Sequence, residues 1–217
     1  MIIVLLGPPG AGKGTQCKRV IEKYDLAHLS SGDILRAERA AGTERGKKAQ
    51  AFMDSGGLVP DDVIIDMMVA AIGKAGDGCV LDGFPRTVVQ AEELDKALTD
   101  ENRKIDAIVN LEIDDDVIAN RLTGRRSCPD CGAIYHVTSL RPKVDDVCDK
   151  CGSGLVQRSD DKTDVVKNRL KTYHEQTVAV VGYYQQVGKI IFDIDADNDI
   201  EKISAAIFEK LDNLLAV

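Results

Sequence analysis

The sequence predicts an α/β fold in which a parallel sheet is covered by helices on both faces. Two observations indicate this fold. Short apolar runs alternate with helical patterns along most of the 217 residues, and this alternation is typical of parallel sheets. In addition, the first apolar run, residues 2–6, leads into a glycine-rich loop, and a helical pattern follows over residues 13–23.

The glycine-rich loop, residues 7–15 with the sequence GPPGAGKGT, has the spacing of a phosphate-binding P-loop. Glycines let backbone N–H groups approach phosphate oxygens, and the helix N-terminus and Lys13 add positive charge. Gly14 stands where Ser or Thr is usual, so we assign no direct Mg²⁺ ligand here. We expect phosphates to contact Gly10, Ala11, Gly12, Lys13, Gly14 and Thr15. The alternative is a glycine-rich turn without a ligand.

The composition is that of an ordinary globular protein, with 44 % hydrophobic and 29 % charged residues and a formal net charge of −8. The negative charge argues against a general nucleic-acid-binding surface and against binding to an anionic membrane. No apolar run approaches the roughly 20 residues of a membrane span. The short apolar N-terminus continues into the loop, which indicates a strand and not an export signal. We expect a cytoplasmic protein with reduced thiols.

Residues 30–59 are expected to form a small helical excursion after a short strand at 26–29. The run SSGD at residues 30–33 is a start signal for a helix that begins near Ile34. A second short helix is expected at 44–54. It ends because the run GGLVP, at residues 56–60, breaks the helical pattern.

The next stretch returns to alternating helices and strands. Asp61 and Asp62 provide the acidic first turn of a helix, and a later apolar strand ends on the carboxylate of Asp82. The expected elements are a helix at 61–74, a strand at 79–82, a helix at 87–98, a strand at 105–111 and a helix at 114–122.

Residues 124–161 interrupt this rhythm, because they are rich in Gly, Cys, Asp and Pro and indicate an inserted lobe. A long helix at 164–187 and a strand at 189–194 follow. The last helix carries a stripe of core residues at helical spacing, namely Ile200, Ile203, Ile207, Leu211 and Leu214. We therefore expect a core of residues 1–29, 60–123 and 162–217 with two insertions, at 30–59 and 124–161. A ligand should lie beyond the carboxyl ends of the strands.

Four cysteines in the inserted lobe have the spacing Cys-x2-Cys-x16-Cys-x2-Cys; they are Cys128, Cys131, Cys148 and Cys151. Two such knuckles predict a tetrahedral structural zinc site, which would fold a lobe too small to have a core of its own. Fe²⁺ or Co²⁺ are alternatives at a thiolate site. Two disulfides are disfavoured in a reducing compartment. Cys17 and Cys79 fall on apolar positions and are expected to be inert core thiols.

Asp82 is at the position of an acid that holds Mg²⁺ through its waters in P-loop proteins; the alternative is a residue that caps the next turn. Together, the P-loop, the run SGDILR at 31–36 and the run LDGFPR at 81–86 resemble the nucleoside monophosphate kinases, and among them the adenylate kinases with a long, zinc-binding lid. The resemblance covers the whole chain, with 30–59 as the NMP-binding segment and 124–161 as the lid. It implies the reaction MgATP + AMP ⇌ MgADP + ADP, catalysed by a monomer.

This reaction needs no general base, because the attacking phosphate oxygen is already ionised. The task is to hold two polyanions in line, for which the planar, permanently charged guanidinium is suited. The resemblance places Asp33 and Asp82 around Mg²⁺ and its waters. It places Arg36 and Arg86 on the AMP phosphate, and it surrounds the ATP phosphates and the group in transit with Arg121, Arg125, Arg158 and Arg169. Arg126 and Arg141 are expected to be ordinary surface side chains.

The resemblance also identifies the residues that meet AMP and its base: Ser31, Gly83, Gln90 and the backbone near Leu58 and Val59. Ser31 replaces a Thr that is commoner in this family, and its hydroxyl can make the same hydrogen bond. We expect structural or surface roles for the three histidines, at positions 28, 136 and 174. Closure over both substrates requires mobile flaps, for which Gly56-Gly57 and Gly124 are candidate flexible points.

Three other functions are compatible with parts of the sequence. A kinase that acts on UMP, CMP or GMP would have a similar donor site. A nucleic-acid or protein-binding module could be built on the four cysteines, although the acidic net charge argues against nucleic acid. A P-loop ATPase or regulatory GTPase would not explain the run LDGFPR, and the sequence has no Asn-Lys-x-Asp motif for reading guanine.

Overall fold

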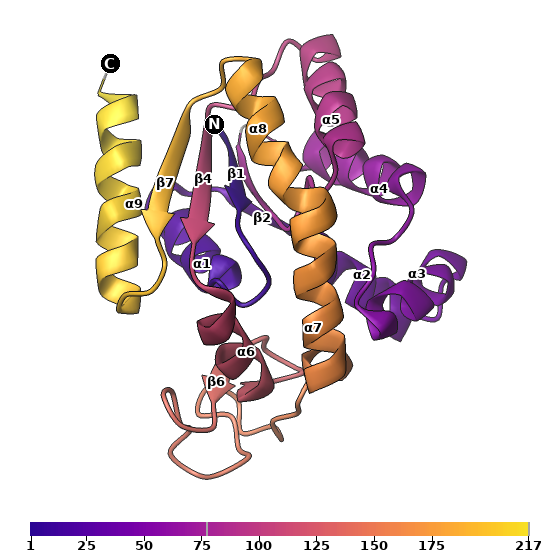
Figure 1. Cartoon of the computed structure of the whole chain (residues 1–217), viewed down its shortest axis with the longest axis vertical. Coiled ribbons are helices and arrows are strands. Elements are labelled where there is room, and N and C mark those ends of the chain that lie inside the picture. Colours follow the sequence, from indigo (N-terminus) through magenta and orange to yellow (C-terminus); the bar gives the residue numbers. More distant parts are fainter. Residues whose placement is uncertain (77, 217) are drawn as a thin grey trace.

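The computed structural model describes residues 1–76 and 78–216, and a parallel sheet forms its centre (Figure 1). The strand order is β2-β3-β1-β4-β7, and each neighbouring pair is parallel. The strands are β1 Ile2–Leu6, β2 Ala27–Ser30, β3 Cys79–Asp82, β4 Ala107–Glu112 and β7 Ile191–Asp195. The predicted α/β class and its strands are confirmed. Strand β4 begins two residues later than expected, next to Asp106, whose carboxylate accepts the N–H of Ile2 at 2.7 Å.

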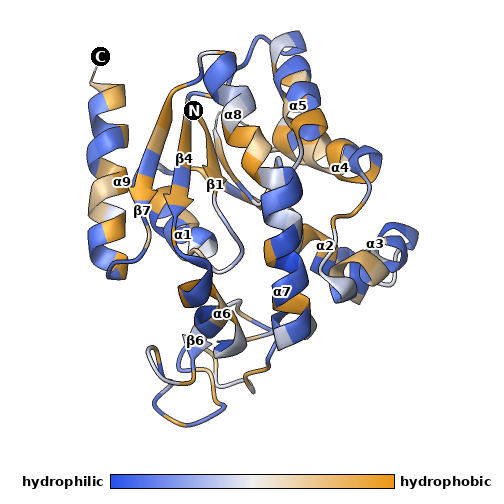
Figure 2. Cartoon of the chain, viewed as in Figure 1, coloured by the Kyte–Doolittle hydropathy of each residue, from blue (hydrophilic) through white to orange (hydrophobic). Residues whose placement is uncertain are grey.

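The central strand β1 is buried on both faces, and its side chains separate into two cores. Ile3 and Leu5 pack with helices α1, Lys13–Tyr24, and α9, Ile200–Leu215. Val4 and its even-numbered neighbours pack on the opposite face with α4 Asp61–Lys74, α5 Val88–Asp100 and α8 Val178–Gln186. Figure 2 shows the resulting apolar strands between helices that are polar on their outer sides.

Two segments project near the carboxyl ends of the strands (Figure 1). The first carries α2 Ser31–Ala40 and α3 Glu44–Ser55. Helix α2 begins three residues earlier than expected, because the Ser30 hydroxyl caps it by accepting the N–H of Asp33 at 3.3 Å. The second segment follows α6, Asp115–Thr123, and contains β5 Arg125–Ser127, β6 Ile134–His136 and a short 3₁₀ turn, Ser159–Asp161.

The helix expected at 164–187 is continuous, but it contains a π-helical turn. Helix α7, Thr163–Thr172, continues through a π-helical turn, Tyr173–Thr177, into α8. The N–H of Val178 donates to the carbonyl of Tyr173, five residues earlier, and such turns are frequent at functional sites. The prediction of an uninterrupted α-helix is therefore wrong over these five residues.

Helix α9 packs its predicted stripe against the sheet and α1. Ile203, Ile207 and Leu211 are buried, whereas Ile200 and Leu214 at its ends are partly buried. The two cysteines expected in the core, Cys17 and Cys79, are both fully buried. Within the described residues, no helix is long and apolar enough to cross a bilayer.

Candidate active site

A cavity of about 1000 Å³ lies at the carboxyl ends of the strands, between the glycine-rich loop and the two projecting segments. Parallel strands present their carboxyl ends at one edge, and this edge is where such folds bind ligands. Every residue that the sequence assigned to nucleotide or phosphate lines this cavity: Gly10, Ala11, Gly12, Lys13, Gly14, Thr15, Ser31, Asp33, Arg36, Leu58, Val59, Asp82, Gly83, Arg86, Gln90, Arg121, Arg125, Arg158 and Arg169.

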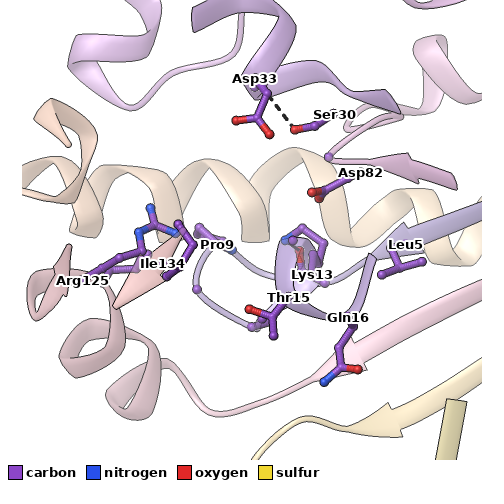
Figure 3. Close-up of a pocket in the computed structure, with 18 of the residues that line it drawn as sticks. Leu5, Pro9, Lys13, Thr15, Gln16, Ser30, Asp33, Asp82, Arg125 and Ile134 are labelled. Atoms are coloured by element: carbon purple, nitrogen blue, oxygen red, sulfur yellow. Dashed lines mark hydrogen bonds between the residues drawn. The ribbon is translucent and has the colours of Figure 1, made fainter. Parts of the chain in front are cut away.

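The glycine-rich loop connects β1 to α1 and curls around the Lys13 ammonium (Figure 3). Lys13 Nζ donates to the carbonyls of Gly7 and Pro8, at 2.7 and 2.8 Å. Gly7 adopts a φ of 133°, and a Cβ there would lie 2.6 Å from the carbonyl oxygen of Leu111, so only glycine fits. Because α1 begins at Lys13, the N–H groups of its first turn have no helical acceptors and can bind an anion.

Burial lowers the pKa of Lys13 to about 8, and the charge of Asp82 opposes this shift. Asp82 is brought beside the loop by the pairing of β1 with β3, in which it lies opposite Leu5. A Cβ built on Gly14 would lie 3.5 Å from Asp82 Oδ2, in ordinary contact. The acid therefore lies next to the first turn of α1, on the floor of the cavity.

His28 is closer to the site than the sequence indicated. Its Nε2 lies 3.4 Å from Asp82 Oδ2, and its side chain is partly buried in the cavity wall. The ligand atoms of His28, Asp82 and Cys17 all lie within 4.8 Å of one another. Of the other two histidines, His174 pairs with Asp115 at 2.8 Å. His136 accepts backbone N–H groups of the inserted lobe and also lines the cavity.

The wall formed by α2 and the β3–α5 connection carries two arginines. Arg86 Nε donates to the Gly83 carbonyl at 2.7 Å, and Arg36 donates to Asp33 at 2.5 Å. Burial lowers the pKa of Arg86 to about 10, and the nearby Arg169 adds to this shift. Burial alone would raise the pKa of Asp33, but Arg36 lowers it below its usual value. This wall therefore gathers positive charge that the protein itself neutralises only in part.

The opposite wall carries the arginines of the inserted lobe and of α6 and α7. Arg125 donates to both carboxylate oxygens of Asp161, at 2.8 and 2.5 Å. Arg169 lies 3.1 Å from Asp160 and 3.3 Å from Asp161. The guanidinium of Arg158 has no hydrogen-bond or ion-pair partner among the described residues. Its pKa is lowered to about 10, first by burial and then by the charge of Arg36.

Two further arginines, Arg126 and Arg141, are not among the residues that line the cavity. Arg126 donates to the carbonyls of Thr123 and Arg125, and Arg141 donates to that of Val137. Arg121, in contrast, lines the cavity and ties α6 to the loop after β7 by donating to the carbonyl of Ala196 at 2.9 Å.

The four cysteines of the inserted lobe come together as one cluster, with all four sulfurs within 4.8 Å of one another. The Sγ atoms of Cys128 and Cys151 are 3.4 Å apart, and those of Cys131 and Cys148 are 3.5 Å apart. Tetrahedral Zn–S bonds of about 2.3 Å place two sulfurs about 3.8 Å apart, whereas a disulfide needs about 2.05 Å. The donor set fits a structural zinc ion, and the cysteines are free of disulfides.

Comparison with known proteins assigns the family. A model of the family "Adenylate kinase" matches residues 5–189 of the chain. The chain belongs to the adenylate kinase family. An adenylate kinase of Archaeoglobus fulgidus is 47 % identical over 216 residues, which cover 97 % of this chain and 99 % of the relative. Adenylate kinases of Lachnospira eligens and Allorhizobium ampelinum are 46 % and 44 % identical, over 97 % and 99 % of this chain and 100 % of each relative.

Membership in the adenylate kinase family confirms the resemblance and makes the chain a phosphotransferase of the predicted kind. The sequence did not identify the acids that pair with Arg125 and Arg169. Asp160 and Asp161 follow Arg158 after a single residue, Ser159, and an acidic pair this close to an arginine at the end of the lobe was the available signal. Lys18 was also missed; it lines the cavity and donates to the Gly132 carbonyl of the lobe at 2.8 Å.

Gly124 lies at one connection of the inserted lobe, and the structure gives it a packing role. Its φ is −83°, within the range open to any residue. A Cβ on Gly124 would lie 2.2 Å from Nε2 of His136, so the glycine admits the imidazole ring. Gly56, at the other predicted flexible point, does have a positive φ of 76° and ends α3.

Proposed function

We propose that the chain catalyses reversible phosphoryl transfer, MgATP + AMP ⇌ MgADP + ADP, as an adenylate kinase. One observation supports this most directly: Lys13 and six arginines converge on a single cavity beside a P-loop. Two bound nucleotides bring several negative charges together, and this concentration of cations offsets their repulsion. The close relatives along the full chain support the same reaction.

The donor nucleotide is assigned to the P-loop side. The first-turn N–H groups of α1 and the Lys13 ammonium bind the ATP phosphates, for which Nζ must turn away from the carbonyls of Gly7 and Pro8. Asp82 and Asp33 line the same cavity and offer the oxygen ligands that suit hydrated Mg²⁺. The ion, when bound, neutralises charge on the phosphates and helps to align them.

The acceptor is assigned to the wall that carries Arg36 and Arg86. Each guanidinium has donors left over after its bonds to Asp33 and Gly83, and these donors bind the AMP phosphate. Ser31 and Gln90 lie beside them, with Leu58 and Val59, and form the pocket for the base. The Ser31 hydroxyl donates to the Gly83 carbonyl at 2.6 Å, so towards a base it acts as an acceptor.

The group in transit is assigned to Arg121, Arg125, Arg158 and Arg169. Among these four, only the guanidinium of Arg158 has no hydrogen-bond or ion-pair partner within the described residues, and it is available to the phosphoryl group directly. Arg125 and Arg169 share Asp161, and Arg169 also pairs with Asp160. Phosphate oxygens compete with these carboxylates when the nucleotides bind. No general base takes part, because the attacking AMP oxygen is ionised.

The two insertions, 30–59 and 124–161, are proposed to close over the substrates and exclude water. Ser159 donates to Asp54 at 3.0 Å, so the end of the lobe touches α3 across the cavity. The four cysteines would hold zinc, which stabilises the lobe and leaves no open coordination position for chemistry. The enzyme is proposed to act as a monomer, as the family resemblance implies, and the six free cysteines fit a cytoplasmic enzyme.

The decisive experiment measures phosphoryl transfer from MgATP to AMP, GMP, CMP and UMP separately, using purified protein with its metal intact. Preference for AMP, with ADP as the product, is the expected result. Preference for another monophosphate would keep the mechanism and overturn the acceptor. ATP hydrolysis that needs no acceptor would overturn the proposed reaction.

A further inference from the structure

Asp61 lies at the first position of α4 and takes part in a closed ring of hydrogen bonds with α5. Its Oδ1 accepts from Gln90 Nε2 at 2.7 Å, and its Oδ2 accepts from Thr87 Oγ1 at 3.1 Å. Thr87 Oγ1 in turn accepts the backbone N–H of Gln90 at 3.1 Å. The sequence assigned Asp61 only the start of a helix, and it is absent from the cavity lining.

The ring fixes which end of the Gln90 amide is oxygen and which is nitrogen. Gln90 is 1 % exposed, and its Oε1 accepts the backbone N–H of Arg86 at 2.7 Å. That N–H can only donate and the Asp61 carboxylate can only accept. A flipped amide would place N–H against N–H and oxygen against carboxylate, and it would leave these groups unpaired in a buried site.

One N–H and one lone pair of the Gln90 amide remain after these two bonds. An N–H next to a carbonyl oxygen matches the Watson–Crick edge of adenine, where ring nitrogen N1 accepts and the amino group N6 donates. Guanine has the reverse pattern, because its N1 donates and its O6 accepts. Only a flipped amide could pair with guanine in the same position.

We propose that Asp61 is a positioning residue that sets the selectivity for the acceptor base by locking the Gln90 amide in the orientation that matches adenine. The inference rests on the proposed function, in which Gln90 meets the base of AMP. Asp61 acts through Gln90 and touches neither substrate. It comes from α4 and Gln90 from α5, so the packing of these two helices determines the selectivity.

The test compares Asp61→Ala and Asp61→Asn with the control Asp62→Ala, in the full chain with its metal bound. Asp62 is the exposed neighbour in the same first turn, and its side chain has no hydrogen bond or ion pair among the described residues. Asn keeps one oxygen acceptor in the same shape, so it should retain part of the effect. The measurements are kcat and KM for AMP and GMP, the KM for ATP, and the side-chain amide NMR signals of Gln90.

We expect Asp61→Ala to raise the KM for AMP and to lower the AMP-to-GMP ratio of kcat/KM, each about ten-fold, the scale of one charge-assisted hydrogen bond. Asp61→Asn should fall between Asp61→Ala and the wild type. The ATP KM should stay within about two-fold of wild type. The chemical shifts of the Gln90 side-chain amide should change in both Asp61 variants and should be unchanged in Asp62→Ala.

Failures of the inference and of the proposed function are distinguishable. Wild-type protein that does not prefer AMP would contradict the proposed function. If the wild type prefers AMP but Asp61→Ala and Asp62→Ala have equal AMP-to-GMP ratios, the function stands and the inference is overturned. The inference is also overturned if an Asp61 variant has a lower melting temperature and its kinetics with ATP and with AMP are impaired equally. That pattern indicates a structural role only.

Discussion

Arg125 and Asp161 join the two chain connections of the inserted lobe. Arg125 begins β5, the first strand of the lobe, and Asp161 ends the 3₁₀ turn that leads out of it. The two bonds between them, at 2.8 and 2.5 Å, are bidentate, and Asp161 is 0 % exposed. A buried carboxylate needs such partners, so this pair fixes the base of the lobe against the core.

Asp161→Asn is therefore expected to destabilise the protein. The substitution leaves Arg125 and Arg169 with a neutral partner that can accept with only one oxygen, and breaking a buried pair costs about 3 kcal/mol. Denaturant unfolding measures the change in the free energy of unfolding. Asp164→Asn, in the exposed first turn of α7, is the matched control. Equal stability of the two variants would show that the pair contributes nothing at the base of the lobe.

Lys13→Met should reduce turnover about 100-fold or more while leaving the fold intact, because it removes the fixed charge beside the phosphates. Steady-state kinetics and circular dichroism measure the two effects. Near-normal turnover would contradict the role proposed for Lys13.

ATP binding without Mg²⁺ should weaken as the pH rises through about 8, the pKa to which burial lowers Lys13 in the free protein. Below this pH the ammonium is already charged. Above it, binding must take up a proton, since the phosphates favour the charged form, and affinity falls by up to about ten-fold per pH unit. Calorimetry in buffers of different ionisation enthalpy measures this uptake. Lys13→Arg, whose guanidinium stays charged, should show no such proton uptake. If ATP binding to this variant had the same pH dependence as in the wild type, the titration would belong to another group.

Arg86→Ala should raise the KM for AMP about 100-fold, the loss of a charged, multiply hydrogen-bonded contact. The dissociation constant for ATP should change less than about three-fold, because Arg86 is assigned to the acceptor wall. Kinetics with each substrate varied, together with direct ATP binding, separates the two. Arg126→Ala is the control with no expected effect. Equal losses for both nucleotides would count against the assignment of Arg86 to AMP.

Chelation of the lobe's metal should unfold the lobe and lower turnover. The lobe has a buried apolar cluster of only five residues, including two of the cysteines: Cys128, Ala133, Tyr135, Cys148 and Leu155. Metal binding can supply roughly 10 kcal/mol for folding such a site. Calorimetric melting and kinetics before and after chelation, with zinc added back, measure the effect. An unchanged melting profile together with unchanged turnover would rule out a structural metal.

The features that the sequence alone determined are local in the chain. The P-loop, the apolar strands and the paired cysteines are read from residues a few positions apart, and the structure places the strands and the four sulfurs as expected. Asp82 could be placed at the loop because a parallel sheet brings carboxyl ends together. The widened turn at 173–177 was not predicted, because its sequence, YHEQT, contains no glycine or proline to mark a break in the helix.

Tertiary structure alone decided the polar pairs that join distant parts of the chain. Asp61 is 29 positions from Gln90, and Asp161 is 36 from Arg125, and an acidic surface residue looks the same in sequence as a buried partner. Helix packing brings α4 beside α5. It also brings the last residues of the lobe next to its first strand. These helix contacts are fixed by the burial of apolar faces that are far apart in the sequence. Polar side chains can pair only where this packing places them within hydrogen-bond distance.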